Sequence, residues 1–528
     1  MTSVAVVALD LRKEKDPEIL RQAALLLERE NQKLVREIAK LVQEITALRG
    51  GDGADAARRV EQLELQLARL QKDLFGPKSE RSSATTDDKG DSGKTATAKK
   101  NGHGRRAQPL LPLISRPYEL DEADRVCTQC GQRLEEFQGQ FERSNEVHVV
   151  RRVFINVEHL QQKYRCPNGC CIETAPGPRK LFRGARYSIG FALEVAIQKY
   201  LFHMPLARQV RQMRGEGLEI DTQTLWDQLE KLATILGPAY ERVRAFVISH
   251  AVVGADETKW RMMGKAGPEV ETGKTWQVWT LAVPQAVYYR IQDSRSHHAA
   301  MTMLDGFKGV VMCDGYKAYN LAAEKLGGVL IAHCWAHVRR AYKDIAEFFP
   351  QETEKIIDLI NELFAIEKLV PPGDDPDTLD SRRALRAQRS KPIVDQIGRW
   401  AVEVQTMPGS GLAKAIDYMT GIWTGLKVFL DDPAVPVSNN VTERANRDPV
   451  LGRKNHYGSR SVRGTEVAAL LYTLLETAKL TDVDPHAYLE IAVNAALDGR
   501  QIPLPHEVRD DARALAEQRL AEVVPGMS

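Results

Sequence analysis

Leucines at a seven-residue spacing dominate the hydrophobic pattern of the N-terminal region. They stand at positions 20, 27, 34, 41 and 48, and Ala24, Asn31, Ile38 and Ile45 fill the intervening core positions. Leu alternating with branched Ile is typical of a parallel two-stranded coiled coil, in which one buried Asn fixes the register. A second apolar run, Val60, Leu63, Leu67, Leu70 and Leu74, follows a glycine-rich break at residues 50–53. We expect residues 15–75 to form a leucine-zipper coiled coil that joins chains into a homodimer or higher oligomer. The alternative is an intramolecular hairpin that turns at the glycines.

The next region changes from apolar periodicity to polar residues and then to paired cysteines. Residues 78–104 are rich in Ser, Thr, Lys, Gly and Asp, so we expect a flexible linker over residues 76–117. Cys127 and Cys130 have two residues between them, and a second set follows an alternating, strand-like stretch: Cys166, Cys170 and Cys171. Two such sets flanking a hairpin predict a zinc ribbon over residues 118–182. One structural Zn²⁺ would be held by Cys127, Cys130, Cys166 and either Cys170 or Cys171. Unrelated buried thiols are the alternative.

Three helices are predicted between the cysteines and the first long strand, at residues 189–202, 206–213 and 222–235. Asp221 or Thr222 can cap the third helix, which carries apolar side chains at helical spacing. Residues 183–248 therefore have the outline of a helix-turn-helix DNA-binding domain, with Arg211 and Arg214 beside it. Many helical bundles share this outline.

Two buried, strand-like runs each end in a carboxylate, at Asp256 and at Asp314. Further strands are expected at 275–283, 286–291 and 328–333, with a helix at 297–304. Three antiparallel strands, a helix, a strand and another strand give the ribonuclease-H-like order, in which the first and fourth strands are neighbours. Asp256 and Asp314 would then lie close together, and two close carboxylates favour a divalent cation between them. Taken alone, Asp314 could equally be a turn or cap residue.

A third carboxylate, Glu443, follows a long helical stretch. Residues 335–430 are predicted to form several helices with a loop at 371–380, and Glu443 falls in the first turn of the next helix, after caps at residues 438–440. On local grounds it is an ordinary capping-box residue. We expect a catalytic domain over residues 249–490, with a helical insertion at about 336–430, and then a C-terminal tail at 491–528. The predicted fold class is multidomain α+β.

Composition and charge limit the partners and the cellular compartment that we expect for the chain. The net charge is +2, so affinity for nucleic acid must come from local basic patches. No stretch approaches 18 apolar residues, and no secretion signal precedes the seven cysteines, which argues against a disulfide framework. We expect a cytoplasmic protein without a membrane partner.

Five motifs together resemble a known family. In order they read ADET, CDGYKAYN, CWAHVRRAY, SNNVTERANR and GRKN, behind the leucine-zipper region and the cysteine module. This combination resembles the IS66 transposases of bacterial insertion sequences. The resemblance implies that Asp256, Asp314 and Glu443 are a DDE triad, with His337 as a supporting residue near the site. Two positions depart from the family pattern: Ser438 replaces a common Asp, and residues 446–449 read Asn-Arg-Asp-Pro in place of Leu-Arg-Pro.

The resemblance also implies a chemistry and a set of partners. Two Mg²⁺ ions roughly 4 Å apart, replaceable by Mn²⁺, would support DNA strand cleavage and strand transfer. The partners would be transposon ends and target DNA, and accessory proteins encoded by the same element are further candidates. Protein bound to DNA would be associated with the bacterial nucleoid. Arg339, Arg340, Arg453 and Lys454 are candidates for phosphate contact, with surface salt bridges as the alternative.

Two other functions compete with transposition. A ribonuclease-H-like nuclease that cuts without joining would carry the same triad. A domesticated DNA-binding regulator would use the zipper, the zinc ribbon and the helix-turn-helix with an inactive core, and the intact triad argues against it.

Overall fold

The computed structural model describes residues 120–127, 129–135, 153–168, 170–263, 275–370 and 373–522. The predicted coiled coil (15–75) and linker (76–117) lie outside these residues. The described chain forms two compact units. One is the helical segment Trp335–Pro433, and the other contains the remaining described residues before and after it. Each unit is described by itself.

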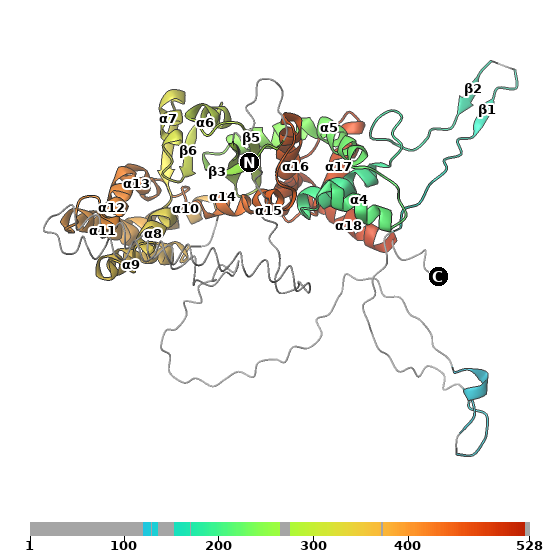
Figure 1. Cartoon of the computed structure of the whole chain (residues 1–528), viewed down its shortest axis with the longest axis horizontal. Coiled ribbons are helices and arrows are strands. Elements are labelled where there is room, and N and C mark those ends of the chain that lie inside the picture. Colours follow the sequence, from blue (N-terminus) through green and yellow to red (C-terminus); the bar gives the residue numbers. More distant parts are fainter. Residues whose placement is uncertain are drawn as a thin grey trace, which may run out of the picture. The chain divides into compact units, whose positions relative to one another are not determined.

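A five-stranded mixed sheet is the centre of the larger unit (Figure 1). Its strands are β3 (Val252–Arg261), β4 (Thr275–Val283), β5 (Ala286–Gln292), β6 (Gly309–Cys313) and β7 (Val329–His333). They lie in the order β5-β4-β3-β6-β7. The first three are antiparallel neighbours, whereas β3, β6 and β7 run parallel. The predicted adjacency of the first and fourth strands is confirmed, and the chain is an α+β protein.

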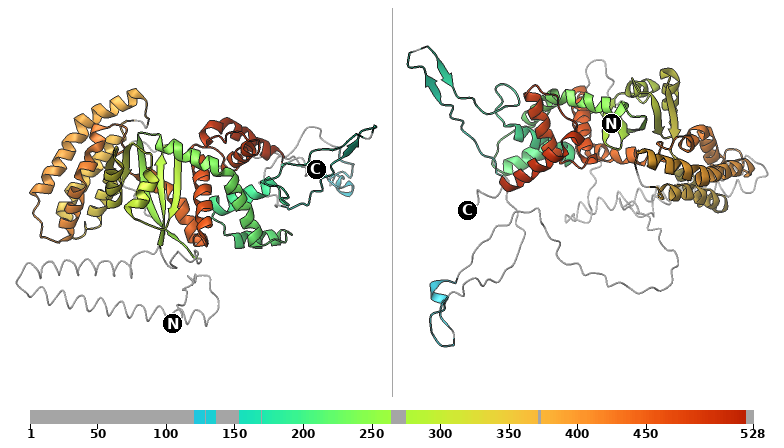
Figure 2. Two further views of the ribbon diagram at one scale, coloured as in Figure 1. Left: turned by 90° about the horizontal axis from the view of Figure 1, so that it is seen from above. Right: turned by 180° about the vertical axis from the view of Figure 1, so that it is seen from behind.

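Helices cover both faces of this sheet. In Figure 1, α6 (His297–Leu304) and α7 (Lys317–Leu326) lie above the strands, and α14 (Asn440–Ala445) and α15 (Arg447–His456) lie below them. The long helix α16 (Val462–Leu480) runs alongside β5, as Figure 2 shows. Two of its threonines satisfy backbone groups of this edge strand. The hydroxyl of Thr473 accepts from the amide of Tyr289. The hydroxyl of Thr477 accepts from the amide of Val287 and donates to the carbonyl of the same residue. The sheet edge is therefore closed by a helix.

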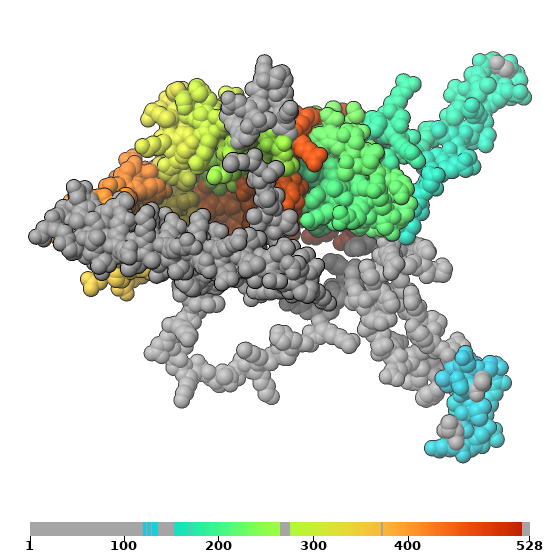
Figure 3. All heavy atoms as spheres, viewed as in Figure 1, coloured from blue at the N-terminus to red at the C-terminus, as the bar shows by residue number. Residues whose placement is uncertain are grey.

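The region before the sheet is helical, as predicted, but one helix is longer than expected. Its elements are α3 (Ile189–Ala196), the π-helical turn η2 (Ile197–Leu201), α4 (Leu206–Gly215) and α5 (Thr222–Ile248). The expected end of α5 at residue 235 was wrong, because the helix continues through Pro238. Buried Ala239, Val243 and Val247 continue its apolar stripe onto the core, and this packing outweighs the hydrogen bond that proline removes. In Figure 3 the atoms of α4 and α5, in green, form one continuous surface.

The smaller unit is a helical bundle. Its elements are α8 (Trp335–Lys343), α9 (Pro350–Glu367), α10 (Pro376–Leu385), η3 (Arg386–Ser390), α11 (Lys391–Glu403), α12 (Gly411–Gly421) and α13 (Trp423–Asp431). Buried Arg386 in η3 forms a bidentate salt bridge with Glu367 of α9, at 2.7 and 2.8 Å, and donates to the carbonyl of Phe429 in α13. This side chain therefore links three elements of the bundle. The loop expected at 371–380 is shorter than predicted. Asp375 caps α10 and Pro376 occupies its first turn, so the residues that suggested a loop begin a helix.

The C-terminal segment is helical up to residue 522. It comprises α17 (Pro485–Leu497), the 3-10 turn η4 (Pro505–Val508) and α18 (Arg509–Glu522). Side chains of the segment expected as a tail, including Ile502, Leu504 and Val508, are buried in the main core. None of the helices in the described ranges is long and apolar enough to span a membrane.

Candidate active site

Strand register brings Asp256 and Asp314 to the same edge of the sheet. Gly254 on β3 pairs with Met312 on β6, and Asp256 and Asp314 each follow two residues later. β6 ends at Cys313, directly before Asp314. The prediction that the first run ends at Asp256 was wrong, because β3 continues to Arg261 through its pairing with β4. Because β3 and β6 are parallel, both carboxylates lie just beyond the carboxyl-terminal end of their pairing, on the side where open α/β sheets bind ligands. The charge of Asp314 is one of the influences that raise the pKa of Asp256, which agrees with their proximity.

Asp256 is half-buried among groups that disfavour its ionised form. Burial raises its pKa to about 7, and the charges of Glu257 and Asp314 add to the effect. Two hydrogen bonds act in the opposite direction: the amide of Glu257 donates to Oδ1 at 2.9 Å and the side chain of Asn446 donates to Oδ2 at 2.7 Å. Such a carboxylate is more fully ionised when a cation lies next to it.

Asn446 belongs to a small network that ties the end of α14 to the sheet. The hydroxyl of Thr280, opposite Asp256 on β4, donates to the Asn446 side-chain oxygen at 2.5 Å. The neighbouring carbonyl of Ala445 accepts from the Tyr289 hydroxyl at 2.6 Å. Sequence reasoning noted Asn446 only as a departure from a family pattern, and no local signal pointed to its contact with Asp256.

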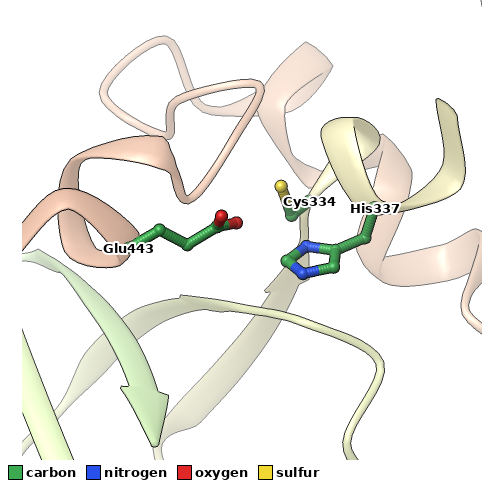
Figure 4. Close-up of side chains that lie close together, drawn as sticks. All are labelled: Cys334, His337 and Glu443. Carbon is green, nitrogen blue, oxygen red and sulfur yellow. The ribbon is translucent and has the colours of Figure 1, made fainter. Parts of the chain in front are cut away.

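Glu443 comes to the same edge on α14, which is seated against β3. Gly254 permits this approach: a Cβ atom at that position would lie 2.0 Å from the Thr442 hydroxyl oxygen. Asn439 precedes the helix, donates its side-chain amide to the carbonyl of Ala255 at 2.7 Å, and directs its backbone N–H at the Cys334 sulfur at 3.2 Å. In Figure 4 the side chain of Glu443 extends toward Cys334, the residue that follows β7. The Cys334 sulfur and a Glu443 carboxylate oxygen lie within 4.8 Å of each other.

The backbone around Asp314 is fixed on both sides. The amide of Tyr316 donates to Oδ1 of Asp314 at 2.9 Å, and Nδ1 of buried His333 lies 2.9 Å from the backbone carbonyl oxygen of Asp314. Burial lowers the pKa of His333 and so favours the neutral ring. Asp314 therefore directly follows β6, and it lies close enough to Asp256 for its charge to help raise the pKa of that carboxylate.

A second buried acid, Glu257, lies beside the two aspartates. Its carboxylate accepts from the Tyr319 hydroxyl at 2.8 Å and from the guanidinium of Arg295 at 2.6 Å. Burial raises its pKa, and the Arg295 and Tyr319 bonds oppose that shift. Arg295 was missed in the sequence because it lies in a turn without periodicity.

The remaining candidates in the helical unit lie on α8. His337 is in its first turn, three residues after Cys334. Arg339 has partners within its own unit, because it donates to the Asn361 side chain at 2.9 Å and lies over the ring of Phe364. Arg340 is exposed. The phosphate role expected of these arginines stays a prediction.

The basic candidates of the larger unit lie on two different helices. On α15, Arg453 donates to the carbonyl of Lys259, and Lys454 is exposed. On α4, Arg211 and Arg214 line a depression of about 420 Å³ together with Asp221 and Thr222 at the start of α5. At this helix start the Asp221 carboxylate already accepts from the amide of Thr224, and Arg214 pairs with Glu219, so the DNA contact expected of these arginines stays a prediction.

The cysteines form two separate turns in the described residues. In the first, the amide of Gly131 donates to the carbonyl of Cys127, and hydrogen bonds from residues 129 and 130 lower the pKa of Cys127. In the second, β1 (Lys163–Arg165) and β2 (Ile172–Thr174) form a hairpin, and the amide of Cys166 donates to the carbonyl of Cys171. Within the described ranges the two turns do not gather their thiols at one point. The shared zinc site stays a prediction.

Comparison with known proteins gives the family context of this site. The sequence model of the transposase IS66 family matches residues 184–467. Uncharacterized protein y4jD of Sinorhizobium fredii is 29% identical over 77% of this chain and 80% of its own length. Uncharacterized protein y4hP of the same organism is 28% identical over 86% of this chain and 84% of its own. No solved structure matches the chain. The family match runs through both paired strands and Glu443, and the chain belongs to the IS66 transposase family.

Proposed function

We propose that this protein is a DDE transposase that cleaves DNA at the ends of an insertion sequence and joins them to a target. Asp256, Asp314 and Glu443 would be its catalytic carboxylates. The observation that supports the proposal is the strand register: the parallel pairing of β3 and β6 ends two residues before Asp256 and Asp314, on the side where open α/β sheets bind ligands. The sheet order also supports a ribonuclease-H-like core for residues 249–490.

The donor set fits divalent cations of the Mg²⁺ type. Such ions prefer carboxylate oxygens. The charges of Glu257 and Asp314 raise the pKa of Asp256, and an added cation would offset this repulsion between the carboxylates. Asp256, Asp314 and Glu443 are the residues that would hold Mg²⁺, or Mn²⁺ in its place. When bound, such ions supply activation of the attacking hydroxyl and stabilisation of the leaving oxygen.

The chain's own residues have distinct tasks around that centre. Asn446 orients the Asp256 carboxylate, while Tyr316 and His333 fix the backbone and side chain of Asp314. The contact of α14 with Gly254 sets how closely Glu443 approaches β3. Pre-positioning of this kind lets the site act without reorganisation during the reaction.

Other parts of the chain are proposed to bring DNA and a second copy of the protein. Residues 183–248 would contact DNA through Arg211 and Arg214, which the depression beside the start of α5 supports. A zinc ribbon over residues 118–182 is supported by the two cysteine turns, although their thiols are not gathered. The coiled coil of residues 15–75 would hold the dimer. His337 stays a candidate for a supporting residue, as the family resemblance implies.

The experiment is to incubate the purified full-length protein with DNA carrying the ends of its own element and with Mg²⁺. The proposal expects cleaved ends that become joined to target DNA, and neither product with Asp256→Asn or Asp314→Asn. Cleavage without joining would favour the nuclease. Binding of the ends without cleavage would favour the regulator.

A further inference from the structure

Arg295 lies in the short turn between β5 and α6, beside the proposed catalytic carboxylates. Its guanidinium donates twice to one oxygen of Glu257, from Nε at 3.0 Å and from Nη2 at 2.6 Å. The guanidinium carbon lies over the ring of Tyr316, 4.1 Å from the ring centre. The Tyr316 hydroxyl in turn donates to the carbonyl of Arg295. The charged group is therefore held by an ion pair on one edge and by an aromatic ring on one face.

These contacts link Arg295 to residues close in sequence to both aspartates. Glu257 directly follows Asp256 on β3, and Tyr316 is two residues beyond Asp314 and donates its amide to that carboxylate. Successive residues of a strand point to opposite faces, so Glu257 faces away from Asp256, toward Tyr319 on α7. Arg295 thus flanks the sheet edge from the side of α6 and α7, whereas Glu443 reaches it from α14 on the other side.

The ion pair is unequally exposed. The side chain of Glu257 is 2% exposed and that of Arg295 is 51% exposed, so the negative partner is buried and the positive partner faces solvent. Within the part of the chain that the structure describes, Nη1 of Arg295 donates to no other group. The guanidinium therefore offers a pre-oriented donor edge at the rim of an acidic site.

We propose that Arg295 binds a backbone phosphate of the DNA strand that enters the carboxylate site, an inference that rests on the proposed function. A cluster of acids repels a polyanion, and a fixed cation at its rim offsets that repulsion locally. Guanidinium donors match phosphate oxygens in geometry, and their orientation here is already set by Glu257 and Tyr316.

The competing explanation is that Arg295 only neutralises buried Glu257. Removing Arg295 alone would not separate the two, because an uncompensated buried carboxylate destabilises the fold. Glu257→Gln removes the buried charge and keeps the arginine. The double variant Glu257→Gln with Arg295→Met also lacks the arginine, so the two differ only in the cation.

The test compares full-length wild type, Glu257→Gln and the double variant for binding to element-end DNA over a range of salt concentrations, with thermal unfolding as the check on folding. The inference expects the double variant to unfold at the temperature of Glu257→Gln. It should bind on the order of 10- to 100-fold more weakly than that single variant, as for loss of a charge-assisted hydrogen bond. Its plot of log affinity against log salt should be shallower by about one.

Equal affinity and equal salt slopes for the two variants would overturn the role of Arg295, whether or not wild type cleaves DNA. If wild type binds and cleaves the ends while these slopes coincide, only this inference fails and the transposase proposal stands. If wild type neither binds nor cleaves them, both fail. Arg383→Met in the helical unit is the matched control, since that exposed arginine pairs with Asp380 and should leave the slope unchanged.

Discussion

Gly254→Ala tests whether the position of Glu443 depends on the contact between β3 and α14. Gly254 has no left-handed backbone angle, so alanine is compatible with its conformation. The added Cβ would lie 2.0 Å from the Thr442 hydroxyl oxygen and 2.9 Å from Oδ1 of Asn439. Ordinary contact begins at 3.4 Å, so the hydroxyl and Cβ must separate by about 1.4 Å.

Both neighbouring side chains are buried, with Thr442 and Asn439 each 2% exposed, so little space is available for a local adjustment. Overpacking of this kind costs about 1–3 kcal/mol of folding free energy. A shift of about 1 Å in a catalytic group lowers the rate by roughly 100-fold. We therefore expect Gly254→Ala to fold, to unfold at a lower temperature, and to cleave element ends about 100-fold more slowly.

The assay is single-turnover cleavage of element-end DNA together with thermal unfolding. Adding Thr442→Ala removes the closest atom and should restore part of the lost rate. Gly421→Ala is the control, because the space around that helical glycine is open and alanine favours the helix. Wild-type cleavage by Gly254→Ala would refute the claim that this contact sets the position of Glu443.

Three further predictions concern other parts of the molecule. Asn446→Ala removes the donor to Asp256 and should raise the Mg²⁺ concentration needed for half-maximal cleavage by about 10-fold or more, measured by metal titration; an unchanged titration would contradict it. Burial raises the pKa of Glu476 from 4.5 to about 8, so the contribution of its protonated form to stability is complete below about pH 4.5 and is lost as pH rises through 8. Glu476→Gln should therefore stabilise the protein more at pH 9 than at pH 5 in thermal unfolding. Equal effects at the two pH values would count against this prediction. Chelation should remove one zinc per chain and unfold residues 118–182, with Cys127→Ser giving metal-free protein, and full zinc content in that variant would exclude Cys127 as a ligand.

The sequence predicted the sheet well because its strands carry strong, unambiguous patterns. The β4 range was predicted without error, and the order of the elements was enough to infer that β3 and β6 are neighbours. The helix through Pro238 was cut short because a Gly-Pro pair is locally a stop signal, and only tertiary packing reverses it.

Other parts of the site left no trace in local patterns. Arg295 and Asn446 act through contacts with residues 38 and 190 positions away, so neither spacing nor periodicity could reveal them. Gly254 was seen only as part of an apolar run, because its role comes from the approach of α14, which lies far along the chain. Long-range packing of this kind is decided by the fold.

Glu443→Gln in full-length protein tests the central claim most directly. Gln serves in a capping box as well as Glu does, so a residue that only caps α14 should tolerate the change. A residue that must supply negative charge to a divalent cation should not. We predict that Glu443→Gln unfolds near the wild-type temperature and binds element ends with near-wild-type affinity, yet yields no cleaved or joined DNA in Mg²⁺. Near-normal strand transfer by this variant would contradict the assignment of Glu443 as a catalytic carboxylate.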